Sequence, residues 1–216
     1  MLAYEQTGEK FNLTTYFKAR ELCIQTTDKI ISQIEVGMNE TDIKEMVEEN
    51  FRQVGVKKFW HPTKIRIGQD TVKTFRELSN PDLRVKKNEI CFVDFGPIID
   101  EHEADYGRTF LFGTKNTNHL IQSSEDIFQL TAAKWKSEGL NGIALYQYAS
   151  NLAYARNLRL NPLMSGHRLG DFPHKLFSSE KLFEIDTVPT KDLWVLEIHV
   201  IDEKNNVGAF FEDILS

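Results

Sequence analysis

The sequence is poor in cysteine, and its cysteines form no recognisable motif. Only Cys23 and Cys91 occur among the 216 residues, far apart and each in an apolar context. That spacing does not match a thiolate metal site or a disulfide framework. We therefore expect two buried, reduced thiols.

Excess positive charge and long hydrophobic runs are missing as well. Lysine and arginine number 26 against 32 acidic residues, a formal net charge of −6. This balance argues against a nucleic-acid partner, which depends on basic groups that displace counterions from phosphates. No apolar run approaches the length that spans a bilayer, which argues against a membrane partner. Because the first residues also lack the pattern of a secretory signal, we expect a cytoplasmic protein.

What the sequence does contain is the patterning of a globular protein, with 41% hydrophobic and 27% charged residues. Apolar periodicity predicts four helices, and Asn39 with Asp42 resembles a capping box at the start of the second. Short apolar runs predict the strands. The expected helices cover about 14–35, 39–55, 123–139 and 142–157, and the expected strands 64–67, 89–94, 105–112, 193–200 and 208–214.

The order helix, helix, strand pair occurs twice along the chain. The turns between the helices also match, Gly37-Met38-Asn39 in the first half and Gly139-Leu140-Asn141 in the second. A match of three residues is weak by itself, so an internal duplication is a hypothesis. We predict a single domain over residues 1–216, made of two halves at about 13–113 and 120–216.

Carboxylates inside apolar strands are the most informative feature. Asp94 and Asp105 bracket a predicted hairpin, and Glu197 and Glu212 lie in the two apolar strands near the C-terminus. A single such acid is as often a salt-bridged structural group. Four of them in two pairs repel one another unless a cation lies between them. The pattern therefore indicates a metal site.

A histidine motif completes a pattern that resembles a known family. The ordered motifs are V-D-F-G around Asp94, D-Y-G-R-T from Asp105, G-H-x-x-G around His167, an L-E strand at Glu197, and Glu212 in the last strand. Each is weak alone, but the five in order resemble the pita-bread metallopeptidases, namely methionine aminopeptidase, aminopeptidase P, prolidase and the related creatinase fold. The resemblance implies an α+β pita-bread fold, with two pseudo-symmetric helix-helix-strand-pair halves around a curved antiparallel sheet.

The resemblance also implies a role for each matching residue. Asp94 would chelate one metal, Asp105 and Glu212 would bridge two, and His167 and Glu197 would complete the second. This oxygen-rich set suits two divalent ions such as Mn, Co, Fe or Zn. A water shared by two metals can give hydroxide near neutral pH, which would attack a peptide carbonyl.

Two residues would act directly on the substrate. Glu197 is the expected proton shuttle to the leaving amine. His174 matches the second histidine of the family, which hydrogen-bonds the substrate carbonyl. His199 shares a strand face with Glu197 and is its rival as a ligand; we favour Glu197 and expect His199 to line the pocket.

The leading interpretation is a dinuclear metal-dependent aminopeptidase or dipeptidase. It would act on peptides with a free N-terminus, with Met-type or Xaa-Pro specificity left open, as a monomer or homodimer. One departure motivates an alternative: Lys73-Thr74-Phe75 stands where the family usually carries a substrate-contacting histidine. The alternative is a catalytically impaired module that binds peptides or a protein partner. A metal-free, creatinase-like hydrolysis is less favoured, because all five ligands are present.

The remaining polar residues have simpler expected roles. His61 could approach the pocket mouth or pack against Trp60. His102, in an acidic hairpin tip, is expected to be solvated, and His119 to cap or precede a helix. Asp213 should face away from Glu212, toward solvent or a helix.

Overall fold

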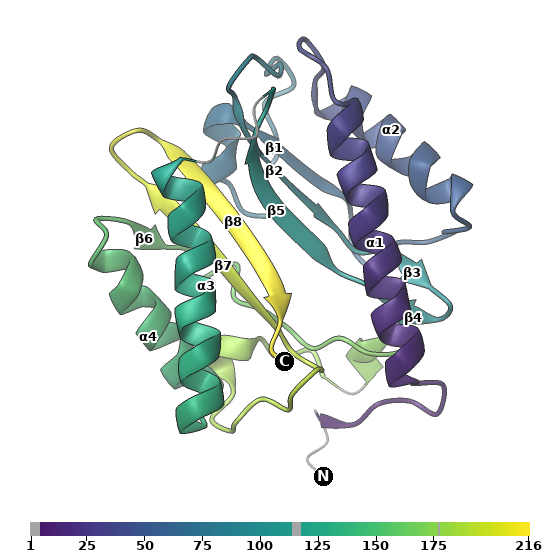
Figure 1. Cartoon of the computed structure of the whole chain (residues 1–216), viewed down its shortest axis with the longest axis vertical. Coiled ribbons are helices and arrows are strands. Elements are labelled where there is room, and N and C mark those ends of the chain that lie inside the picture. The colour runs from purple at the N-terminus through teal and green to yellow at the C-terminus, as the bar shows by residue number, and fades with distance from the viewer. Residues whose placement is uncertain (1–4, 114–117, 177) are drawn as a thin grey trace.

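An antiparallel sheet with helices on one face forms the framework (Figure 1). The structure is a computed structural model that describes residues 5–113, 118–176 and 178–216. The helices are α1 (Leu13–Gln33), α2 (Glu40–Gln53), α3 (His119–Glu138) and α4 (Gly142–Tyr154). The strands are β1 (Lys64–Ile67), β2 (Ile90–Phe95), β3 (Ile98–Ile99), β4 (His102–Glu103), β5 (Tyr106–Leu111), β6 (Arg159–Leu160), β7 (Val195–Asp202) and β8 (Val207–Ile214), and the short 3₁₀ helices are η2 (Gly68–Val72), η3 (His174–Leu176) and η4 (Leu182–Glu184).

The strand order of the main sheet reads symmetrically from its centre, as β1-β2-β5-β8-β7-β6. Each half therefore contributes two helices and three antiparallel strands. The halves meet where β5 lies beside β8, with Arg108 opposite Phe211. This arrangement confirms the predicted fold class. The strand connectivity of the two halves is equivalent, as an internal duplication requires.

Asparagine is the N-cap of each of the four α-helices in the described part of the chain. The side chain of each accepts a hydrogen bond from the backbone N–H three residues on, which satisfies a donor that the first helical turn leaves free. Asn39 and Asp42 also form the predicted capping box, with both bonds at 2.9 Å. The four cap residues are Asn12, Asn39, Asn118 and Asn141.

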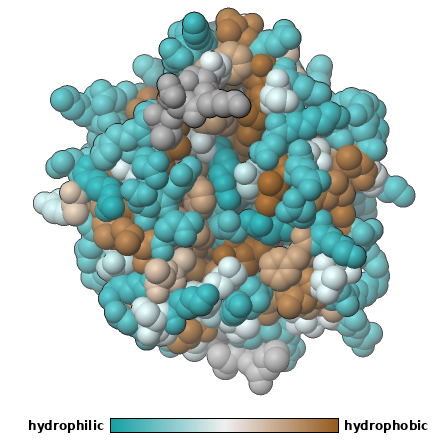
Figure 2. Space-filling view, viewed as in Figure 1, coloured by the Kyte–Doolittle hydropathy of each residue, from teal (hydrophilic) through white to brown (hydrophobic). Residues whose placement is uncertain are grey.

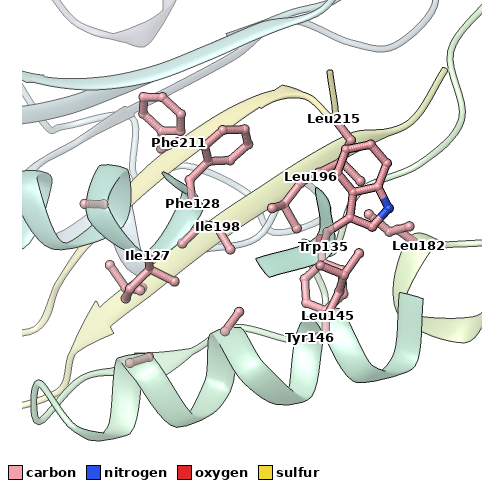
Figure 3. Close-up of a cluster of buried hydrophobic side chains, with 14 of the residues drawn as sticks. Ile127, Phe128, Trp135, Leu145, Tyr146, Leu182, Leu196, Ile198, Phe211 and Leu215 are labelled. Atoms are coloured by element: carbon pink, nitrogen blue, oxygen red, sulfur yellow. The ribbon is translucent and has the colours of Figure 1, made fainter. Parts of the chain in front are cut away.

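Two separate hydrophobic cores lie between the sheet and the helices. The first-half core packs α1 and α2 on β1 and β2 and contains both cysteines, which are free and buried as predicted. The second-half core packs α3 and α4 on β7 and β8 (Figure 3). In that view, Leu196, Ile198 and Phe211 lie in the cluster between these strands and the helices. The residues between them along each strand must point to the opposite face of the sheet.

The outer surface carries no single dominant patch on the face shown in Figure 2, where hydrophilic and hydrophobic residues are interspersed. Among the described residues, no helix has both the length and the apolar composition needed to cross a membrane.

Candidate metal site

The alternation of the strands collects the predicted acids on the face of the sheet away from the helices. On β7, Leu196 and Ile198 belong to the second-half core, so Glu197 points the other way. On β8 the same holds for Glu212, which follows the core residue Phe211. Glu197 and Glu212 are direct cross-strand partners. The second half therefore places two carboxylates side by side.

The first half brings its aspartates to the same place. Asp94 near the end of β2 lies opposite Gly107 of β5, and Asp105 directly precedes β5. A Cβ added at Gly107 would lie 2.7 Å from Oε1 of Glu212. A larger residue there would displace Glu212, so this glycine allows the carboxylate to lie across the junction between the halves.

The carboxylate of Asp105 lies between two histidines. Its Oδ1 is 3.3 Å from Nε2 of His61, and its Oδ2 is 3.0 Å from Nε2 of His167. His61 Nε2 is also 3.3 Å from Oδ1 of Asp94, and His167 Nε2 is 3.5 Å from Oε1 of Glu197. The structure thus brings all five predicted ligands into one cluster, together with His61.

Burial and mutual repulsion shift the pKa values of the acids. Burial raises the pKa of Asp94 to about 6, although the positive charge of His61 acts to lower it. In the same way, burial raises the pKa of Glu197 to about 7, although the charge of His167 acts to lower it. Burial, reinforced by Asp105 and Asp94, raises the pKa of Glu212 well above its usual range. Asp105 differs, because hydrogen bonds from both histidines outweigh burial and hold its pKa low.

The histidines respond in the opposite sense. Burial alone would lower the pKa of His61 and of His167, but the neighbouring carboxylates outweigh it and raise each to about 9. In the absence of another cation, protons and imidazolium groups must therefore balance the acids.

This donor set fits divalent cations. Oε1 of Glu212 is buried and accepts no hydrogen bond from any described residue, which is the state of an oxygen whose partner is an ion. Ligand atoms of His61, Asp94 and Asp105 all lie within 4.8 Å of one another. Carboxylate oxygens with imidazole nitrogens are the ligands of Mn, Fe, Co and Zn ions. The individual ligand roles stay predictions.

His174 lies beside this cluster and is fixed by a buried acid. Its Nδ1 is 2.6 Å from Oε2 of Glu103, and its backbone N–H donates to Oε1 of the same carboxylate at 3.0 Å. The ring stacks on that of His167 at 5.9 Å between centroids and lies 5.5 Å from that of Trp60. Burial lowers the pKa of His174, which Glu103 opposes.

His199 cannot compete with Glu197 as a ligand. Its Nε2 donates to the carbonyl of Thr71 at 2.8 Å, and its Nδ1 faces the amide of Asn161 at 3.1 Å. Both ring nitrogens are therefore engaged, and burial lowers the pKa of His199 to about 4. The side chain is fully buried, so the expectation that it lines an open pocket is wrong.

The prediction for His102 is also wrong. The side chain is 2% exposed, because the segment before α1 folds over it. Its Nε2 accepts the backbone N–H of Asn12 at 2.9 Å, and the ring of Phe11 packs on it. His119 is the first residue of α3, directly after the cap. Asp213 pairs with Arg20 of α1, so its predicted contact with a helix is confirmed.

One partner in the site was not predicted. Glu103 was missed as the partner of His174, although its alternation with Asp105 places both on one face and offered a signal. For His61, both predicted alternatives are correct, since the ring packs on Trp60 at 4.3 Å while Nε2 reaches the acids. The choice between these alternatives depends on how residues 58–60 pair with the hairpin, which no local pattern shows.

A buried cluster of carboxylates and histidines on a pita-bread sheet defines a class of metal-dependent hydrolases. Comparison with known families gives the same class, since the model of metallopeptidase family M24 matches residues 15–216. The chain belongs to this family.

Solved structures with the same fold include an X-Pro aminopeptidase from Thermotoga maritima (TM-score 0.76, 16% identity, 98% of this chain and 62% of that one). A prolidase from Pyrococcus horikoshii is also similar (TM-score 0.75, 19% identity, covering 98% of this chain and 60% of that one). A methionine aminopeptidase from Thermotoga maritima matches over 98% of both chains (TM-score 0.74, 16% identity). At these identities the likeness shows the fold alone.

One curated relative is an uncharacterized peptidase of Staphylococcus aureus, 27% identical over 99 residues. That alignment covers 46% of this chain and 28% of the relative. The chain thus aligns with less than two thirds of this relative and of the first two structures.

Proposed function

We propose that this protein is a dinuclear metal-dependent aminopeptidase or dipeptidase that hydrolyses the first peptide bond of substrates with a free N-terminus. The observation that carries the proposal is Asp105, whose two carboxylate oxygens each face a different histidine. A carboxylate whose two oxygens point to two different histidines is suited to bind one cation with each oxygen. Asp94, Asp105, His167, Glu197 and Glu212 would hold them.

Two divalent cations bound there would polarise the peptide carbonyl and lower the pKa of a water molecule. The surrounding acids would attract the substrate ammonium group, which favours a free N-terminus. Glu197 is suited to move a proton to the leaving amine, because its carboxylate lies inside the cluster, 3.5 Å from Nε2 of His167.

His174 would contact the substrate carbonyl from the side of the cluster. Because Nδ1 is engaged with Glu103, only Nε2 is free to meet the substrate. When both ring nitrogens carry hydrogen, Nε2–H would donate a hydrogen bond to the carbonyl oxygen, and the Glu103 carboxylate would stabilise the positive ring against the effect of burial.

Hydrolysis of Met-Xaa and Xaa-Pro peptides tests the proposal, measured with chelator and with added Mn or Co. We expect turnover that depends on the ion, and loss of turnover in Glu197→Gln. His119→Gln, at the start of α3, is a control that should keep the activity. A folded protein with no turnover on any of these peptides under any ion would overturn the proposal.

A further inference from the structure

We propose that His61 is a sixth metal ligand, which binds the ion on the Asp94 side of the site through Nε2. It would give each half of the molecule one imidazole and two carboxylates. The inference rests on the proposed function, because it assigns a residue to the same pair of ions. It adds a ligand outside the five that the family motifs supply.

The distances around His61 match those between ligands of a shared ion. Its Nε2 is 3.3 Å from Oδ1 of Asp94 and 3.3 Å from Oδ1 of Asp105. Ligand atoms about 2.1 Å from one ion lie roughly 3.0–3.4 Å apart at octahedral to tetrahedral angles. The hydrogen bond to Asp105 is long for a charge-assisted one, which measures about 2.7–2.9 Å. Nε2 is equally distant from both acids, so an ion could be shared by all three groups.

The tautomer of His61 leaves Nε2 available. Its Nδ1 lies 3.0 Å from the carbonyl oxygen of Pro62, which can only accept, so Nδ1 carries the hydrogen. His167 has the same arrangement, with Nδ1 2.8 Å from the carbonyl of Arg168. A backbone carbonyl that fixes Nδ1–H and orients Nε2 is the usual support of a ligating histidine.

The segment that carries His61 is fixed to the hairpin that carries the aspartates. The backbone N–H of Trp60 donates to the carbonyl of Gly96, and its indole N–H donates to the carbonyl of Ala104, both at 2.9 Å. Ala104 directly precedes Asp105. The imidazole is therefore held in place relative to both acids.

Gly96 provides the space that this arrangement needs. A Cβ added there would lie 2.3 Å from Nε2 of His61 and 2.4 Å from the indole nitrogen of Trp60. Any other residue would push the ring away from the acids. The glycine of the V-D-F-G motif thus admits the imidazole directly beside Asp94.

X-ray absorption of the wild-type protein loaded with two Zn or Co ions tests the inference without any variant. Scattering from imidazole rings counts the histidines bound. We expect an average of one imidazole per ion, from His61 and His167. An average of half an imidazole per ion would overturn the inference.

Metal titration of His61→Gln provides the second test, with circular dichroism to confirm folding and His119→Gln as the matched control. We expect the affinity for one ion to fall at least about tenfold, since losing a ligand costs no less than losing the group that orients it. The other ion should bind as in the wild type. Unchanged affinity for both ions would overturn the inference.

The outcomes also separate the inference from the proposed function. Two bound ions with two imidazoles, but no peptide hydrolysis, would contradict the function and support the ligand. Peptide hydrolysis by a protein with two bound ions but a single bound imidazole would support the proposed function and contradict the role of His61 as a ligand. A wild-type protein that binds no divalent ion would overturn both.

Discussion

The two halves of the molecule have the same architecture but present their acids differently. Within the described residues, each has two α-helices, three strands of the main sheet and its own hydrophobic core. The first half uses short aspartates, one near a strand end and one just before a strand. The second uses longer glutamates that face each other across β7 and β8. Neither half holds the whole cluster, so the site depends on the junction between them.

Side chains form part of the hydrogen bonds between β5 and β8, where the two halves meet. The hydroxyl of Thr109 donates to the carbonyl of Phe210 at 2.8 Å and accepts its N–H at 2.6 Å. The guanidinium of Arg108 donates to the carbonyl of Glu212 and pairs with Asp213. Ions held by acids of both halves would add a cross-link at this junction, and binding to the folded state alone stabilises it.

The largest expected effect is that of Asp105→Asn, which weakens the contact with both histidines at once. We expect hydrolysis to fall about 10³-fold or more, because several kcal/mol of transition-state stabilisation depend on the ions. Asp213→Asn changes an acid on the helix side of the sheet, and its rate of hydrolysis should stay within about threefold of the wild-type rate. Activity of Asp105→Asn within tenfold of wild type would show that this acid does not join the halves.

Paired core substitutions compare the halves directly. Ile43→Ala in the first core and Leu145→Ala in the second should each cost about 2–5 kcal/mol of unfolding free energy. Both thiols lie in the first core, and burial raises the pKa of Cys91 to about 12, so labelling requires that core to open. In the metal-free protein, Ile43→Ala should therefore speed thiol labelling more than Leu145→Ala. Equal acceleration would mean that the halves open as one unit.

The pH dependence of stability should change sign with the metal. In the folded protein the pKa of Glu197 is about 7, that of Asp94 about 6 and those of both histidines about 9, all above their unfolded values. These four groups outweigh the opposite contributions of His174 and His199, whose pKa values are lowered. The metal-free fold therefore binds more protons than the unfolded chain and loses stability as pH rises from 5 to 9. The loss should be on the order of a few kcal/mol.

With saturating divalent ions the trend should reverse, because ions compete with protons for the same ligands. Urea unfolding at several pH values, with chelator and with Mn, measures both trends. Metal-free stability that rises from pH 5 to 9 would contradict this electrostatic account.

The smallest expected effect is that of Glu103→Gln, which weakens the orientation of His174. We expect kcat to fall about tenfold with the metal content unchanged. Glu101→Gln, an exposed acid two residues earlier that pairs with Lys10, is the matched control. A loss of metal in Glu103→Gln would show that this acid supports the ligands instead.

Local sequence signals predicted most of the framework. Strand β1 lies at the predicted residues, and the capping box at Asn39 was identified. Alternation along β8 correctly predicted that Asp213 faces away from Glu212 and contacts a helix. The contacts of His102 could not be predicted and those of His61 were predicted only as two alternatives, because each histidine contacts a segment distant in sequence. Buried ring nitrogens such as those of His199 find partners that only the tertiary structure supplies.

The central claim is that both halves together hold two ions. Metal analysis after equilibrium dialysis against Mn or Co tests it most directly, with wild type, Asp105→Asn and Asp213→Asn compared. We expect two ions per wild-type chain, two in Asp213→Asn, and loss of both in Asp105→Asn. A wild-type chain with one ion or none, or an Asp105→Asn chain that keeps two, would contradict it.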